Sequence, residues 1–186
     1  MNLRRLVILG VFLGTMSPSC AQWRDDGKPV ADTSWRKAWG KFGAMLHLTN
    51  KPDELFRAWE KPGASVPVSV TDVAKRGEPV VGVVFFSGCA TNDAGNCDSE
   101  AAFQVFKPDG SPYDAEQKGE FWTHKPPPEG QLQLGVGAIG IRIEPQDPAG
   151  TYSIRARLRD KVSGAEVELT RTFRVEADSK ASSPKP

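Results

Sequence analysis

Apolar and polar residues alternate in short stretches along most of this chain, and glycine or proline separates one stretch from the next. A period of two is typical of strands that bury one face. The clearest case is residues 152–175, where two alternating stretches flank a turn at residues 161–164. This pattern predicts an antiparallel hairpin with its apolar set facing a core.

The polar face of this hairpin carries charge on both strands. Pairing about the turn places Arg159 opposite Glu166 and Arg157 opposite Glu168. With Arg155, the three arginines of one strand form either an anion site or one side of a set of solvated ion pairs. The glutamates opposite them favour ion pairs, which add little stability at a surface.

Further stretches predict more strands. Residues 79–87 are almost continuously apolar, which is typical of a central strand buried on both faces. Shorter stretches predict the other strands, with Pro67 favouring a sheet edge and the glycines at 135–140 favouring a bend. These strands are expected at residues 44–49, 66–71, 101–106, 120–124 and 131–144.

Two stretches predict helices instead. Residues 52–60 begin with a proline and two acidic residues, which suit a first helical turn, and continue with one apolar face. Earlier in the chain, Ser34 is placed to cap a short helix in which Trp35 and Trp39 share a face. The aromatic residues of this leader form either a partner surface or rings packed on the sandwich, and packing is the interpretation we favour.

The first 21 residues are typical of an export signal. Arg4 and Arg5 precede an apolar run, small residues follow, and Gln22 becomes the mature start. An alternative makes Cys20 the lipid-bearing first residue of a lipoprotein, although Ser17 stands where such a signal needs an apolar residue. The apolar run is too short to cross a bilayer core of ~30 Å, so we expect no transmembrane segment in the mature chain.

Cys89 and Cys97 remain as an even pair after removal of the signal and predict a disulfide, since an exported protein meets an oxidising compartment. The loop between them is rich in turn formers. Oxygen-bearing side chains crowd it and suit Ca²⁺, but EF-hand spacing is absent and these residue types are also usual in tight turns. They are Asn92, Asp93, Asn96, Asp98 and Glu100.

Composition limits the classes of partner. The 24 basic and 23 acidic residues leave about one net negative charge once the signal is removed. We therefore expect neither nucleic acid nor an anionic membrane as partner. The length suits one domain, and the 18 glycines and 15 prolines suit the many turns of a sandwich or barrel.

No catalytic motif is present, so we expect a protein that is not an enzyme. His47 and His124 lie in separate strand-like stretches, and nothing links either one to a nucleophile. Phosphate-binding, dinucleotide and zinc-protease motifs are absent, and no metal or cofactor is expected. The prolines at 126–128 either dock on a partner or keep a loop out of a sheet, and the second use is the more common.

The end of the chain resembles immunoglobulin-like sandwiches of the bacterial macroglobulin type. The resemblance rests on the Gly150-Thr151-Tyr152 run, the Ser163-Gly164 turn and the ending Phe173-Arg174-Val175. It implies that the tyrosine hydroxyl ties down a neighbouring corner. Segments over residues 35–176 are also similar to exported bacterial proteins of unassigned function; they are 42–46, Trp59, 107–110 and 147–148.

Together these observations predict an all-β protein, an immunoglobulin-like antiparallel sandwich of about seven or eight strands with one short helix. Its expected parts are a signal peptide (1–21), an aromatic leader (22–43), the sandwich (44–177) and a disordered tail (178–186). We expect a non-catalytic envelope protein, periplasmic or secreted, that binds another envelope protein or acts as an accessory module. A ligand-binding module for a glycan or Ca²⁺, and hence a small-molecule ligand, is the alternative.

Overall fold

The structure, a computed structural model, describes residues 23–25, 27–61 and 69–177. The expected signal segment, Cys20 and the tail at 178–186 lie outside these residues. So does the first half of the strand expected at 66–71, and the described remainder, 69–71, does not form a strand. Among the described residues, no helix has the length and apolar character needed to cross a membrane.

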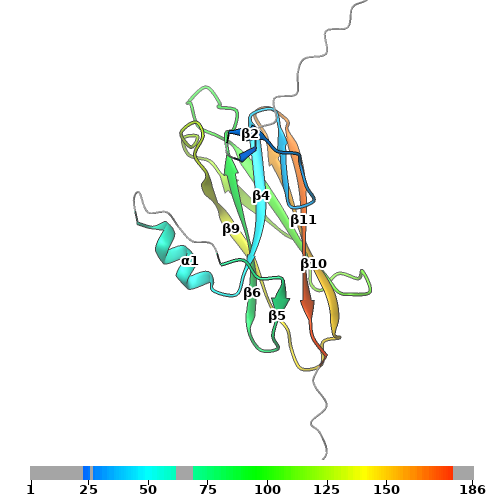
Figure 1. Ribbon diagram of the computed structural model, residues 1–186. Helices are drawn as coiled ribbons and strands as arrows, with labels where there is room; N and C mark the ends of the chain where they lie inside the picture. Colours follow the sequence, from blue (N-terminus) through cyan, green and yellow to red (C-terminus); the bar gives the residue numbers. More distant parts are fainter. Residues whose placement is uncertain (1–22, 26, 62–68, 178–186) are drawn as a thin grey trace, which may run out of the picture.

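Two sheets pack face to face and form a β-sandwich, which confirms the predicted fold class (Figure 1). One sheet has four strands in the order β3-β4-β6-β9, and the other has five in the order β5-β11-β10-β7-β8. Neighbours are antiparallel except β5 and β11, which pair in parallel. The strands of the four-stranded sheet are β3 (Arg36–Trp39), β4 (Phe42–Thr49), β6 (Pro79–Ser87) and β9 (Gln133–Arg142); those of the five-stranded sheet are β5 (Val73–Ala74), β7 (Ser99–Phe106), β8 (Gln117–Trp122), β10 (Gly150–Asp160) and β11 (Glu166–Val175); a separate pair comprises β1 (Arg24–Asp25) and β2 (Lys28–Pro29).

The core lies between the two sheets because each strand turns every second residue inward. In β10, Tyr152, Ile154 and Ala156 are fully buried, as the alternation predicts. The hairpin of β10 and β11 has the predicted register, in which Arg159 lies opposite Glu166 and Arg157 lies opposite Glu168. Strand β6 pairs with both β4 and β9 and is buried on both faces, as predicted for a central strand.

The only helix in the described part of the chain, α1 (Pro52–Trp59), lies to one side of the four-stranded sheet (Figure 1). Its buried residue Leu55 packs with Val83, Phe85 and Leu134, which the sheet turns away from the main core. The helix therefore covers apolar residues that β6 would otherwise expose on its outer face. The helix predicted at 52–60 is present at Pro52–Trp59. Its position on the outer face of a sheet differs from the one that the sequence suggests, in which the helix closes one end of the core.

The prediction of a short helix around Trp35 and Trp39 is wrong, because this segment forms strand β3. Trp39 pairs with Phe42 and Arg36 with Met45 across a tight turn. Gly40 enables the turn by adopting a positive φ of 58°, which residues with a Cβ rarely do. A spacing of four residues between aromatics fits a helical face, but it equally fits one face of a strand.

One corner of the sandwich is fixed by a tyrosine, as the resemblance implied. The hydroxyl of Tyr152 donates a hydrogen bond of 2.8 Å to the carbonyl oxygen of Pro148. The Tyr152 ring stacks on Phe173 with centroids 5.4 Å apart, which joins β10 to β11. Nearby, Tyr113 donates to the Asp147 carboxylate at 2.6 Å, and burial followed by this hydrogen bond raises the pKa of Tyr113.

Candidate functional site

The two histidines lie on separate elements, His47 in a strand of the four-stranded sheet and His124 in the loop after β8 of the other sheet, and their rings contact different residues. His124 follows β8 and is exposed, with its ring edge-on to Trp122. His47 lies in β4 on the outer face of the four-stranded sheet. The contacts of the two rings are with aromatic side chains and, for His47, with the Met45 sulfur, which differs from the pairing of a nucleophile with its base.

His47 is half-buried in an apolar and aromatic setting. Its Nε2 atom lies 3.1 Å from the sulfur of Met45, and its ring lies edge-on to Trp35 and Phe85 at 5.6 and 5.5 Å. Burial, followed by the positive charge of Arg171, lowers the pKa of His47 to about 4. His47 is thus neutral at physiological pH, and its ring functions as part of the packing.

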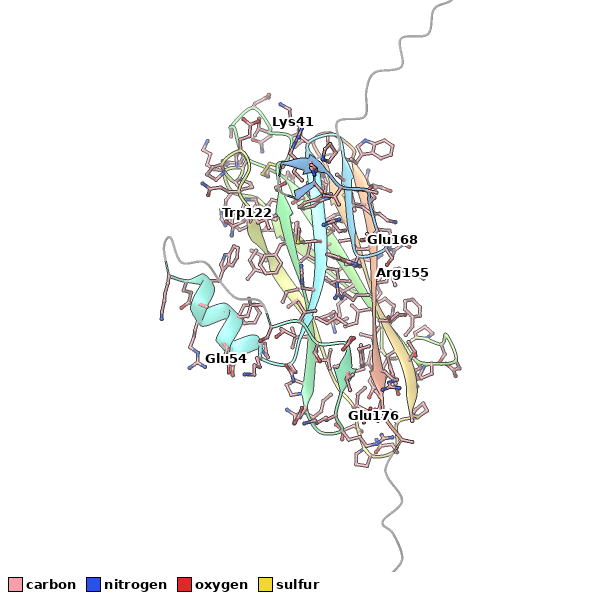
Figure 2. The ribbon with its side chains drawn as sticks, viewed as in Figure 1. Lys41, Glu54, Trp122, Arg155, Glu168 and Glu176 are labelled. Carbon is pink, nitrogen blue, oxygen red and sulfur yellow. A yellow bond between two sulfur atoms is a disulfide. The ribbon has the colours of Figure 1, made fainter. Side chains whose placement is uncertain are left out.

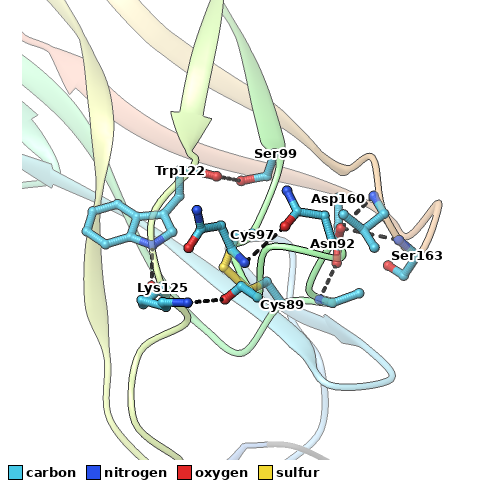
Figure 3. Close-up of a disulfide and its surroundings, with 12 residues drawn as sticks. Cys89, Asn92, Cys97, Ser99, Trp122, Lys125, Asp160 and Ser163 are labelled. Carbon is cyan, nitrogen blue, oxygen red and sulfur yellow. Dashed lines mark hydrogen bonds between the residues drawn. A yellow bond between two sulfur atoms is a disulfide. The ribbon is translucent and has the colours of Figure 1, made fainter.

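The predicted disulfide between Cys89 and Cys97 is present and closes the loop between β6 and β7, with Cα atoms 5.8 Å apart (Figure 3). The fully buried side chain of Asp160 holds this loop against the β10–β11 turn. Its carboxylate accepts hydrogen bonds from the backbone of Ala90 at 2.8 Å and Val162 at 3.0 Å. Sequence reasoning missed Asp160, although an aspartate directly before a turn often accepts hydrogen bonds from the backbone of that turn.

Two of the oxygen-rich residues of the disulfide loop have side-chain partners within the protein. The side chain of Asn92 accepts hydrogen bonds from the backbone N–H groups of Ala94 and Asn96, and these bonds stabilise a local turn. Asp98 forms an ion pair with Lys161 at 2.5 Å. No group of three or more His, Cys, Asp or Glu residues within the described ranges is placed to hold a metal ion. The disulfide and these contacts hold the loop in a compact turn.

The prolines at 126–128 lie in the loop between β8 and β9 and outside both strands. Pro126 and Pro127 are half-buried, and Pro128 is exposed. The loop is anchored by Trp122, whose indole nitrogen donates a hydrogen bond of 2.9 Å to the carbonyl of Lys125. Because only one proline is exposed, this segment offers little surface for docking.

A groove of about 720 Å³ crosses the outer face of the five-stranded sheet, over β8, β7, β10 and β11. Its lining is charged, and the charges compensate one another. Of the lining residues, Arg159 pairs with Glu166, Glu168 pairs with Arg155 beside the groove (Figure 2), and Arg157 and Lys118 both pair with Glu116 beside the groove. Bonds from Lys118 and then Arg157 lower the pKa of Glu116. The three arginines thus form ion pairs, and the expected register is correct, although Arg157 takes Glu116 as partner.

The tryptophans of the N-terminal segment have different environments. Trp23 is buried, with 8% of its surface exposed, and Trp35 is half-buried against His47. Trp39, at the end of edge strand β3, is 67% exposed, the largest fraction among the large apolar residues in the described part of the chain. Packing thus accounts for two of the three rings and leaves Trp39 facing solvent.

Two arginines contact Trp35, next to strand β3. Their environment differs from that of the arginines on the five-stranded sheet, which form ion pairs. The guanidinium carbons of Arg171 and Arg36 lie 4.8 and 5.2 Å from the ring centre of Trp35, which is the geometry of cation–π contacts. Both side chains are half-buried. Neither has a carboxylate within 4 Å among the residues that the structure describes.

Arg171 is the residue of this group that sequence reasoning missed. It follows Val167 and Leu169 at a position that alternation assigns to the core face, and it pairs with the buried Ile154. An arginine at a core position is unusual unless it has a partner. The break in the apolar alternation at Arg171 could therefore have identified this residue from the sequence. Arg171 lies near the open edge of β11, between Thr170, which bonds to Ser34, and Arg174, which bonds to Asp72.

We call Trp35, Arg36, Trp39 and Arg171 the β3 surface. Strand β3 forms one edge of the four-stranded sheet and also contacts β11 of the other sheet. The surface therefore lies where the two sheets meet along one side of the sandwich. Tryptophan and arginine are the residue types most enriched where binding energy concentrates in protein interfaces.

No protein-family model and no curated protein matches this sequence. Solved structures share the fold only distantly. A family 123 glycoside hydrolase from Clostridium perfringens is 10% identical with a TM-score of 0.42, over 73% of this chain and 27% of that one. A CARDB domain of a Pyrococcus furiosus protein, solved with di-metal ions, is 8% identical with a TM-score of 0.38, over 79% of this chain and 99% of that one. The chain is a β-sandwich domain with distant structural similarity to these proteins, and it spans about a quarter of the length of the glycoside hydrolase.

Proposed function

We propose that this chain is a non-catalytic exported envelope protein that binds another envelope protein, as a subunit or an accessory module, through the β3 surface. The observation that carries the proposal is the exposure of Trp39, 67% of whose surface faces solvent on an edge strand. A large aromatic ring at this exposure, on a strand whose other end lies next to the contact of Trp35 with two arginines, is typical of a binding surface.

Two features support an extracytoplasmic location, periplasmic or secreted. The disulfide between Cys89 and Cys97 is of the kind that persists in oxidising compartments. The N-terminal sequence has the pattern of an export signal, with anchoring through Cys20 as the alternative. We propose no enzymatic activity, because the described histidines, His47 and His124, contact aromatic rings and His47 is neutral.

The test places a photo-crosslinking amino acid at Trp39 or, as a control, at Phe56, which is 37% exposed on α1. After irradiation of the cell envelope, we expect one recurrent partner at near-equal amount from position 39 and none from position 56. Trp39→Ala should remove capture of that partner by a tag and leave the unfolding temperature unchanged. Absence of a partner from position 39, together with a thermal shift on adding oligosaccharides, would instead favour a glycan-binding module that uses the groove on the five-stranded sheet.

A further inference from the structure

Charge is distributed unevenly around β3. Residues 27–43 contain four basic residues and one acidic residue, although the whole chain is near neutral. The acidic one is Asp32, whose carboxylate accepts a bond from the backbone of Ala38. The basic ones are Lys28, Arg36, Lys37 and Lys41. Lys41 lies in the β3–β4 turn at one end of the sandwich (Figure 2).

The sandwich balances its other arginines with acidic or carbonyl groups. Those of the groove pair with glutamates, and Arg142 donates to the carbonyl of Gly77 at 2.7 Å. Arg36 makes one long bond of 3.4 Å to the carbonyl of Ala31, and its buried Nε atom has no hydrogen-bond partner among the described residues. For Arg171, the guanidinium group lies over the Trp35 ring and interacts through its charge with His47, and it forms no ion pair within the described chain.

Half-buried cations without counter-charges are costly in a folded protein, and they gain most from an oxyanion that enters from outside. A ring such as Trp35 fixes guanidinium groups in position before binding, which reduces the entropy lost on association. Trp39 adds an apolar contact on the same strand. The ligand that fits this combination carries carboxylates beside an apolar residue.

We infer that the β3 surface is a docking site for an acidic protein segment, whose carboxylates pair with Arg36 and Arg171 while an apolar side chain covers Trp39. The inference rests on the proposed function and specifies the chemistry of its partner. The charge complementarity predicts an affinity that falls with ionic strength, because surface charge pairs are screened by salt.

Poly-L-glutamate is a defined acidic probe for this surface. Titration of the purified chain should shift the tryptophan indole NMR signals, and the affinity should drop by about tenfold in Arg36→Gln/Arg171→Gln. The matched control Arg155→Gln/Arg159→Gln removes the same charge from arginines that already have glutamate partners, and should change the affinity by less than about twofold. Equal loss in both variants, or binding to phosphatidylglycerol vesicles without binding to poly-L-glutamate, would overturn the inference.

The failure of this inference is distinguishable from failure of the proposed function. A partner crosslinked at position 39 whose yield is insensitive to salt and to Arg36→Gln/Arg171→Gln would refute the acidic site and retain the binding function. Arginine-dependent binding of poly-L-glutamate without any crosslinked partner would support the site and refute the function. Circular dichroism of each variant shows whether a loss of binding comes from loss of the fold.

Discussion

His47 shows how one residue makes the stability of the sandwich depend on pH. Burial and the charge of Arg171 lower its pKa from 6.5 to about 4 in the folded chain. Between these two pH values the unfolded chain binds a proton that the folded chain does not. Stability therefore rises with pH across this window, is fully present above pH 6.5, and is lost as the pH falls towards 4.

We expect His47→Gln to flatten this dependence, since glutamine does not titrate. The difference between pH 6.5 and pH 4 should shrink by an amount on the order of 2 kcal/mol, measured by urea unfolding at closely spaced pH values. His124→Gln is the matched control, because it removes a histidine whose exposed ring contacts Trp122 and not the residues around His47. Identical profiles for the wild type and His47→Gln would contradict the assignment.

At the scale of elements, the contact between β9 and β8 depends on a missing side chain. A Cβ atom added to Gly135 would lie 1.9 Å from the ring of Phe121, which is fully buried. Phe121 in turn packs edge-on to Phe86 of β6 with centroids 5.0 Å apart. The glycine thus lets a ring from the five-stranded sheet approach the backbone of the four-stranded sheet.

Gly135→Ala should therefore destabilise the protein by about 1–3 kcal/mol, the usual cost of overpacking a core. Gly119→Ala is a matched control in β8, because a Cβ there meets no atom within 4 Å and the backbone φ is ordinary. Urea unfolding followed by circular dichroism measures both. A similar effect of the two substitutions would show that backbone entropy, and not the contact with Phe121, explains the cost.

The longest hairpin was predictable from local pattern, whereas a short strand beside its chain neighbour was not. The β10–β11 hairpin has its expected register because alternation and a turn suffice to specify it. Strand β3 was missed because a four-residue aromatic spacing suits both helix and strand, and its pairing with β4 decides between them. Of the candidate site, Trp39 was recognisable as an aromatic residue of the leader, whereas the proximity of Arg171 to Trp35 depends on how β11 and β3 meet across the two sheets.

For the whole molecule, a disulfide and several hydrogen bonds connect the loops at one end of the sandwich. The disulfide shortens the loop after β6, and Asp160 joins this loop to the β10–β11 turn (Figure 3). Cys97 also donates its backbone N–H to the carbonyl of His124, which brings in the loop after β8. Three connections of the sandwich thus meet at the disulfide, and Cys89 packs against the main core cluster, whose buried members are other residues.

Because the buried members of the main core cluster are other residues, Cys89→Ala/Cys97→Ala should fold but be less stable. A bridge between residues eight positions apart closes a small loop, for which chain entropy predicts a contribution of about 2–3 kcal/mol. Urea unfolding of the oxidised protein, with and without reductant, measures it, and the double variant serves as the control because reductant should not affect it. Equal stability of the oxidised protein and the variant would contradict the contribution expected from restricting the unfolded chain.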